Sequence, residues 1–286
     1  MFHEIHPLCK LSVANIYGDT LLHSHTDGCV GYWDASNSLS YGGSGTTWNN
    51  LNAATSKSPY NRHLTLVNGT SFLLGAGSEP AQFVCDGSDD YIGAAAGGYG
   101  APAFQINNSQ SYTICFWVKM ALAEISEHHF LTTGNANEED SNFNGLQFGA
   151  AIGGSLAASF MKDGTDWIDG HEFPNGTRIG NKWQMLSFVH NCDLLSPDVN
   201  RSYFFSNARY CPIDEGDEEQ TLDWEESING ALAGITAPEF GRTHNVNEYE
   251  YTPGDTAFSL ILIYDRTLLH SEIISNFNAT KGDFGY

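Results

Sequence analysis

The sequence of 286 residues has few basic side chains and no long apolar run. It contains 12 lysines and arginines against 34 aspartates and glutamates, a formal net charge of −22. A surface this negative repels phosphate backbones and anionic lipid headgroups, so we expect no nucleic-acid partner. No segment approaches the roughly 18 apolar residues of a membrane span. Residues 1–28 lack the basic and apolar regions of a secretion signal, so we expect a chain made in the cytoplasm that does not enter a membrane.

Closely spaced cysteine pairs are also absent. The chain has six cysteines, namely Cys9, Cys29, Cys85, Cys115, Cys192 and Cys211. None of them forms a Cys-x-x-Cys pair, so the spacing favours neither a zinc site nor a thioredoxin-like motif. We expect buried free thiols.

Glycine and aromatic residues are abundant. With 30 glycines and 13% aromatic residues, the composition is typical of short strands joined by tight turns. The clearest predicted strand is SYTICFWVKM at 111–120, where apolar residues occupy both faces. A strand with two apolar faces belongs inside a two-sheet sandwich. Similar patterns at 154–162, 183–190 and 258–264 complete the prediction of an all-β protein.

Two short turn signals follow apolar segments. Asn68-Gly69 lies between apolar flanks in LTLVNGTSFLL, the strongest short signal for a β-hairpin. In AQFVCDGSDDYIG a strand meets Asp86-Gly87 and resumes at Tyr91, which also suits a tight hairpin.

One amphipathic helix is predicted near the C-terminus. Within 269–279, Ile273, Ile274 and Phe277 share a helical face, and Lys281-Gly282 supplies a stop signal. So short a helix is marginal alone in water. We therefore expect it to lie on the sandwich and to cover an edge or an open end.

The first part of the chain differs from the rest. Residues 1–27 hold four of the 11 histidines and show no sustained alternation. We predict an N-terminal arm at 1–27 and one domain at 28–286, and we interpret the histidines as surface residues in preference to metal ligands.

Six blocks occur in order along the chain. They are YWDASNSLSYGGSGTTWNNLN at 32–52, VNGTSF at 67–72, FVCDGSDDYI at 83–92, SYTICFWVKM at 111–120, NKWQMLSFV at 181–189 and IYDRTLLHSEIISNFNATKGDFGY at 263–286. They span about nine tenths of the chain and together resemble the laminin-G-like group of the concanavalin A-like lectin and glucanase jelly rolls. The resemblance implies a two-sheet antiparallel jelly-roll sandwich with a short C-terminal helix.

The first and last blocks resemble those of tailed-phage virion proteins. This implies a non-enzymatic virion component, such as a decoration, fibre or host-attachment protein, that contacts other virion proteins and host surface glycans. Phage structural proteins usually form symmetric homo-oligomers, so we expect a trimer or another ring. The alternative is a free carbohydrate-binding lectin. In one departure from relatives, Leu269 stands where Ser or Thr usually caps the helix ahead of Glu272, so we expect the cap from His270 or Ser271.

Calcium is the cofactor that the resemblance implies, because relatives bind it at one rim of the sandwich through aspartates and carbonyl groups. Two acidic groups on predicted loops are candidates: Asp86, Asp89 and Asp90, and Glu138, Glu139 and Asp140. A purely structural role in the turn also suits Asp86 and Asp89, so both interpretations stay open.

A sugar site would combine exposed aromatic faces with polar loop groups. Trp167, His171 and Trp224 lie in polar, loop-like surroundings and are the candidates. Four other tryptophans, Trp33, Trp48, Trp117 and Trp183, lie within strand patterns and are predicted to be core residues. Burial of a loop tryptophan under its own loop is the competing interpretation.

Catalysis is the least favoured hypothesis. A retaining glycoside hydrolase needs two carboxylates about 5–5.5 Å apart. The segment EGDEE, with Glu215 and Glu219, matches a Glu-x-Asp-x-Glu pattern in its residue types. However, eight of the 13 residues from Asp214 to Glu226 are acidic, which is typical of a solvated loop. No nucleophile elbow occurs in a strand-to-helix setting.

Overall fold

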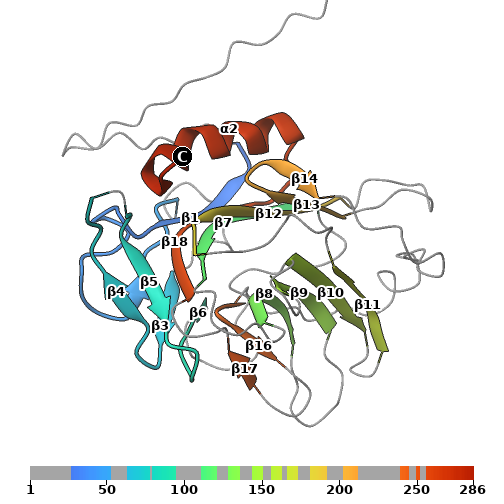
Figure 1. The fold of residues 1–286 in the computed structure, drawn as a ribbon, viewed down its shortest axis with the longest axis horizontal. Coiled ribbons are helices and arrows are strands. Elements are labelled where there is room, and N and C mark those ends of the chain that lie inside the picture. The colour runs from blue at the N-terminus through green and yellow to red at the C-terminus, as the bar shows by residue number, and fades with distance from the viewer. Residues whose placement is uncertain are drawn as a thin grey trace, which may run out of the picture.

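The computed structural model describes residues 27–52, 63–77, 79–94, 111–120, 128–135, 144–150, 156–162, 166–172, 181–191, 202–211, 239–244, 249–251 and 256–286. These residues form two antiparallel sheets packed face to face, a small hairpin and a C-terminal helix (Figure 1). The predicted all-β sandwich is therefore confirmed. The predicted arm at 1–27 lies outside the described residues except for Asp27. No helix of the described chain is long and apolar enough to cross a membrane.

Each of the two large sheets contains eight strands. The first runs in the order β14 (Arg209–Cys211), β13 (Ser202–Ser206), β12 (Gln184–His190), β7 (Tyr112–Lys119), β18 (Thr256–Tyr264), β5 (Gln82–Cys85) and β4 (Ser71–Leu73), and β1 (Cys29–Asp34) pairs with the second half of β18. The second runs β11 (Asp166–Glu172), β10 (Leu156–Lys162), β9 (Asn144–Ala150), β8 (His128–Asn135), β15 (Glu239–Phe240), β6 (Tyr91–Ala94), β3 (Leu64–Val67) and β2 (Thr47–Trp48). A separate hairpin joins β16 (Arg242–His244) to β17 (Tyr249–Tyr251).

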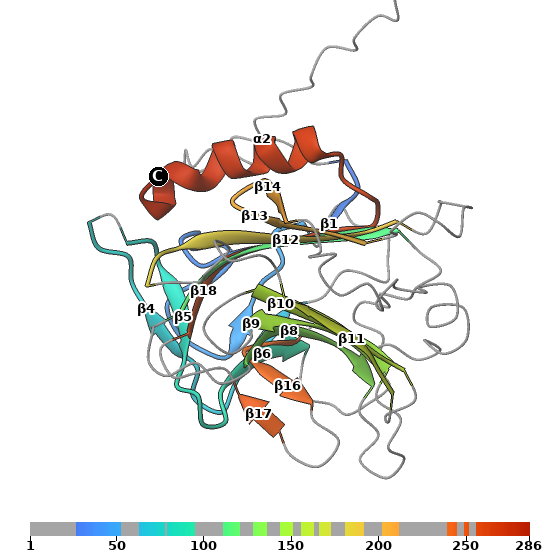
Figure 2. The same cartoon turned by 45° about the vertical axis from the view of Figure 1, so that its right-hand side comes forward.

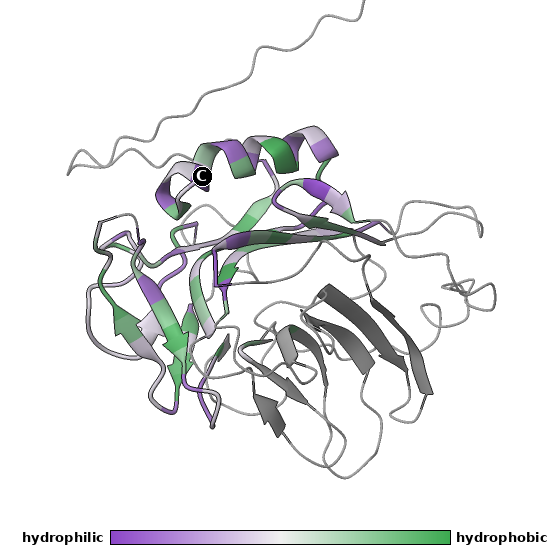
Figure 3. Ribbon diagram, viewed as in Figure 1, coloured by the Kyte–Doolittle hydropathy of each residue, from purple (hydrophilic) through white to green (hydrophobic). Residues whose placement is uncertain are grey.

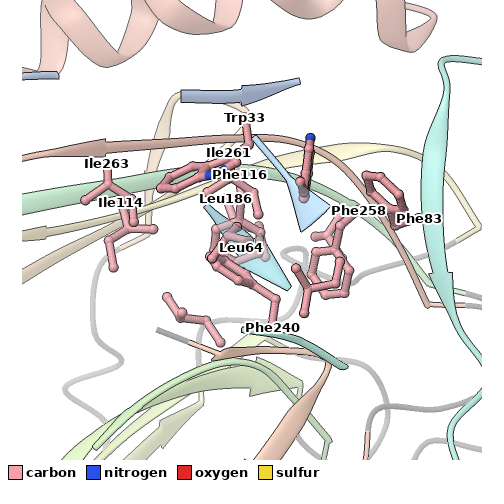
Figure 4. Packing of buried hydrophobic residues seen from close by; sticks show 14 of the residues in the cluster. Trp33, Leu64, Phe83, Ile114, Phe116, Leu186, Phe240, Phe258, Ile261 and Ile263 are labelled. Carbon is pink, nitrogen blue, oxygen red and sulfur yellow. The ribbon is translucent and has the colours of Figure 1, made fainter. Parts of the chain in front are cut away.

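The main core lies between the two sheets. Phe116 of β7 and Ile261 of β18 point into it from the first sheet, and Leu64 and Phe240 meet them from the second (Figure 4). All four side chains are fully buried. The inward face of β7 is thus buried as its alternation predicted.

The outward face of β7 is buried by a different element. Helix α2 (His270–Thr280) and the 3₁₀ turn η1 (Lys281–Phe284) lie over the outer face of the first sheet (Figure 2). The ring of Trp117 stacks on Phe284 at a centroid distance of 3.9 Å, and its Nε1–H donates to Thr280 Oγ1 at 2.9 Å. The expectation that the helix covers an edge or open end is wrong: it covers a face.

The buried side of α2 also differs from the prediction. Ile273 is fully buried, but Ile274 is 39% exposed, and the other buried positions are Asn276 and Thr280. Polar and apolar residues alternate along the helix, and apolar residues recur in the strands beneath it (Figure 3). Asn276 is buried because its amide donates to the hydroxyl of Tyr264 at 3.0 Å.

The structure corrects the predicted N-cap of α2. Leu269 is itself the N-cap, and its N–H donates to Glu272 Oε2 at 2.8 Å, so neither His270 nor Ser271 caps the helix. The Glu272 carboxylate also receives two hydrogen bonds from the Arg266 guanidinium at 2.8 and 2.9 Å. At the other end α2 stops at Thr280, next to the predicted stop signal Lys281-Gly282, and the chain tightens into η1, which is followed by the left-handed Gly285 with φ +82°.

The prediction for Asn68-Gly69 is right about the tight turn and wrong about how the two strands beside it pair. Asn68 and Gly69 have the positive φ values of a tight turn, +57° and +115°. However, β3 belongs to the second sheet and β4 to the first, so the turn is an arch between sheets and not a hairpin. The Asp86–Asp90 turn likewise links β5 of the first sheet to β6 of the second.

Hydrogen bonds join strand β1 to the residues that follow it in the block at 32–52. Asp34 ends β1, and its N–H donates to Ser40 Oγ at 3.1 Å. The N–H of Leu51 donates to the carbonyl of Tyr32 at 2.8 Å, and Asn50 Oδ1 accepts from the N–H of Tyr32 at 3.0 Å. The segment after β2 therefore covers the free edge of β1.

The predictions for buried tryptophans and cysteines are confirmed where the structure describes them. The buried tryptophans are Trp33, Trp48, Trp117 and Trp183. The buried free cysteines are Cys29, Cys85, Cys115 and Cys211, while Cys9 and Cys192 lie outside the described residues.

Candidate functional site

Two arches lie side by side at one rim of the sandwich. The strands on either side of them are neighbours, because β3 pairs with β6 in one sheet and β4 pairs with β5 in the other. The Asn68 side-chain amide donates to the carbonyl of Asp89 at 2.9 Å, and Thr70 Oγ1 donates to the carbonyl of Tyr91 at 3.2 Å. These bonds tie the arches into one rim. Sequence reasoning assigned neither Asn68 nor Thr70 to this site, because the hairpin interpretation separated the two turns.

Three carboxylates converge on this rim. One oxygen each of Asp86, Asp89 and Asp90 lie within 4.8 Å of one another. Asp86 and Asp89 are exposed, and Asp90 is 3% exposed. The predicted metal residues are thus brought together, at a spacing that a calcium ion with 2.3–2.6 Å ligand distances can bridge.

The turn interpretation also has support. Asp86 Oδ1 accepts from the N–H of Ser88 at 2.8 Å, and Asp90 Oδ2 accepts from the N–H of Asp86 at 3.3 Å. Each carboxylate still has a second oxygen, so the turn and an ion do not compete for the same atoms.

The electrostatics of the cluster disfavour three negative charges. Burial raises the pKa of Asp90, and the charges of Asp86 and Asp89 raise it further, while the N–H of Asp86 lowers it. A divalent cation would reverse these effects by offsetting both the repulsion and the desolvation.

The candidate sugar residues fall in two places. Trp167 and His171 lie on β11, which is an edge strand of the second sheet. Trp167 pairs with Met161 and His171 with Ala158, and an irregularity in the register lies between the two pairs. The two candidates therefore share one strand, and the register irregularity lies between them. Trp224 lies outside the described residues.

The remaining acidic candidates also lie outside the described part of the chain. These are Glu138, Glu139 and Asp140, and the pair Glu215 and Glu219.

The chain matches no protein-family model and no curated protein sequence. It is similar in fold to solved structures of low sequence identity. Trypanosoma rangeli sialidase aligns with a TM-score of 0.56 and 12% identity, covering 91% of this chain and 34% of the sialidase. The binding domain of Paraclostridial Mosquitocidal Protein 1 aligns with a TM-score of 0.55 and 12% identity over 88% of this chain and 52% of that one.

A third similar structure is the receptor-binding domain of a botulinum neurotoxin of the C/D mosaic serotype. Its TM-score is 0.55 at 10% identity, over 88% of this chain and 51% of the toxin domain. At these identities the likeness shows the fold alone. The chain spans about a third of the length of the sialidases and about half of the toxin domains.

Proposed function

We propose that this chain is a non-enzymatic component of a tailed-phage virion that displays a lectin-like β-sandwich. The observation that carries the proposal is that both large sheets form one sandwich, with the outer face of the first sheet covered by the chain's own C-terminal segment. The described residues therefore cover both faces of the first sheet. The sandwich folds of the two toxin binding domains support a recognition role.

The composition of the candidate catalytic segment disfavours an enzyme. The acidic segment around Glu215 and Glu219 reads as a solvated loop. A glycoside hydrolase would release reducing sugar, and Glu215→Gln and Glu219→Gln would each abolish the release. A broad polysaccharide panel without release would exclude this alternative.

The virion role is supported by the sequence blocks at the two ends of the sandwich. In the structure the start and the end of the sandwich meet, because β1 pairs with β18 and Arg266 Nε–H donates to the carbonyl of Asp27 at 3.0 Å. The arm at 1–27 would leave the sandwich beside the start of α2 and dock on other virion proteins. Copies of the chain would form a homo-oligomer.

Mass spectrometry of gradient-purified phage particles tests the virion role. The expected result is that the chain co-sediments with the particles in a constant ratio to the major structural proteins. Absence from the particles, with the chain free in the lysate, would leave the lectin alternative in its place.

Calcium binding at Asp86, Asp89 and Asp90 is part of the proposal. The carboxylate spacing and the buried position of Asp90 support it. Millimolar calcium should raise the melting temperature of the wild-type chain, because an ion that binds only the folded state stabilises it. Asp90→Asn should lose this rise, whereas Asp283→Asn, an exposed aspartate on η1, should keep it. An equal rise in both variants would contradict the site.

A further inference from the structure

The end strands of the two sheets differ in how they are protected against pairing with another chain. Exposed strand edges tend to pair with other chains, and proteins block them with charge, short length or a covering segment. Strand β11 carries Asp166, Asp169 and Glu172, β14 carries Arg209, and β2 has only two residues. Among the described end strands, β4 is the one with three residues and no charge.

The apolar character continues beyond β4. Phe72 points inward against the main core, whereas Leu73 is 49% and Leu74 81% exposed. No residue from 68 to 78 is charged, in a chain with a net charge of −22. This edge is therefore an uncharged apolar strip on an acidic protein.

The strip is held in place by the turn that follows it. Ala76 and Glu79 exchange two backbone hydrogen bonds of 3.0 and 3.1 Å. The Glu79 carboxylate accepts from Lys119 Nζ at 2.6 Å and from Trp183 Nε1 at 3.0 Å. A fixed backbone loses little conformational entropy when it pairs with another strand.

We propose that β4 pairs antiparallel with β4 of a second copy of this chain, so that the first sheets of the two copies join across a twofold axis. Two copies of the same edge strand can exchange backbone hydrogen bonds when they run antiparallel. Such a contact uses the same surface on both copies and is therefore complete in a dimer. A second copy is the favoured occupant because the strip offers no charge to a cationic partner. Two acidic chains also repel least where neither carries charge.

The two exposed leucines of each copy, Leu73 and Leu74, would lie against the partner's strand close to this axis. The contact is short, so the dimer is weak and assembles at high local concentration, as on a particle surface. Raising the salt concentration should strengthen it, since salt screens the repulsion between the copies. The inference rests on the self-association in the proposed function and names its surface.

Sedimentation velocity of the full chain over a range of concentrations tests the proposal. The weight-average mass should rise toward twice the chain mass and stop there. Leu74→Lys should weaken the dimer at least tenfold, because it places a charged, strongly hydrated side chain of each copy in the apolar contact. Lysine lowers the net negative charge, so greater overall repulsion could not explain the loss.

Leu269→Lys is the matched control. Leu269 is also a highly exposed leucine, at 67%, but it lies at the start of α2. This variant should dimerise like the wild type. Hydrogen exchange provides a second measurement in the unmutated chain, where the amides of 71–74 should become slower to exchange as the concentration rises.

Two results would overturn the pairing of β4. If both variants dimerise like the wild type, the surface is wrong while self-association stands. If the wild-type chain stays monomeric at every concentration, the proposed self-association fails as well. Neither result changes whether the chain is found in purified virions, which tests the proposed function separately.

Discussion

Phe116 and Trp117 are neighbours in β7, yet different structures bury them. Phe116 packs between the two sheets against Phe240 and Phe258, with ring centroids 5.6 and 6.3 Å apart. Trp117 packs on the opposite face, under the chain's last residues, where it stacks on Phe284. Alternation in a strand therefore shows that both faces are covered, but not whether a sheet or a helix covers each of them.

The largest effect should come from truncating either ring. Phe116→Ala and Trp117→Ala should each lower the free energy of unfolding by about 3–5 kcal/mol, because each leaves a large cavity in a packed layer. Urea denaturation followed by circular dichroism measures both losses.

Proteolysis should separate the two variants. In Trp117→Ala, cleavage within 277–286 should occur at denaturant concentrations where the sandwich is still folded. In Phe116→Ala, it should occur only together with unfolding of the whole domain. Identical cleavage patterns would contradict the division into an inner and an outer layer.

The next largest loss of stability should come from breaking the ion pair at the start of α2. Arg266→Ala removes two charge-assisted hydrogen bonds to Glu272 and one to the carbonyl of Asp27. We expect a loss of about 1–3 kcal/mol and faster hydrogen exchange in α2. Arg209→Ala, which changes an exposed residue of β14, should alter stability by less than about 0.5 kcal/mol. Unchanged exchange in α2 would show that the ion pair does not hold the helix.

Asp34 should make stability depend on pH. Burial raises its pKa from the ordinary value of 3.8 to about 6, with smaller effects in both directions from nearby groups. A raised carboxyl pKa means that the folded state holds the proton more tightly, so stability should increase as the pH falls from about 6 to 4.

Asp34→Asn isolates this effect. The variant should be about 1–2 kcal/mol more stable than the wild type at pH 7.5, and the difference should vanish near pH 4. Thermal unfolding of both proteins at several pH values measures it. A difference that does not change with pH would show that Asp34 is charged in the folded protein at little cost.

The smallest effect should come from the last residue. The Tyr286 hydroxyl donates to the carbonyl of Trp183 at 2.7 Å. Tyr286→Phe should lower the free energy of unfolding by about 0.5–1.5 kcal/mol, the usual contribution of one hydrogen bond. Urea denaturation measures it, and a loss above about 3 kcal/mol would indicate that the hydroxyl organises the whole tail.

Local patterns predicted the strands well and their connections less well. The alternation in β7 and the four strand tryptophans were predicted correctly because burial on a strand follows a period of two. Asn68-Gly69 was misread because turn conformation does not determine which sheet the next strand joins. By contrast, Asn207 and Ala208 also have positive φ values, of 50° and 61°, and join β13 to β14 in a true hairpin.

Positions set by tertiary packing could not be predicted. Ile274 was assigned to the buried face, but the rotation of α2 follows from Asn276 and Thr280, whose side chains bond to Tyr264 and Trp117. The convergence of Asp86, Asp89 and Asp90 was predictable because they lie within one short turn. The placement of Trp167 and His171 was not, because it depends on the register irregularity between β10 and β11.

Glycan binding by the whole chain is the decisive measurement for a lectin-like, non-enzymatic role. On an array of bacterial surface glycans, we expect saturable binding to a subset of spots without release of sugar. We also expect weaker binding after Trp167→Ala or Trp224→Ala and unchanged binding after Tyr210→Ala, a surface aromatic on β14 that is 44% exposed. Absence of binding to any glycan, or hydrolysis of those bound, would contradict a lectin-like, non-enzymatic role.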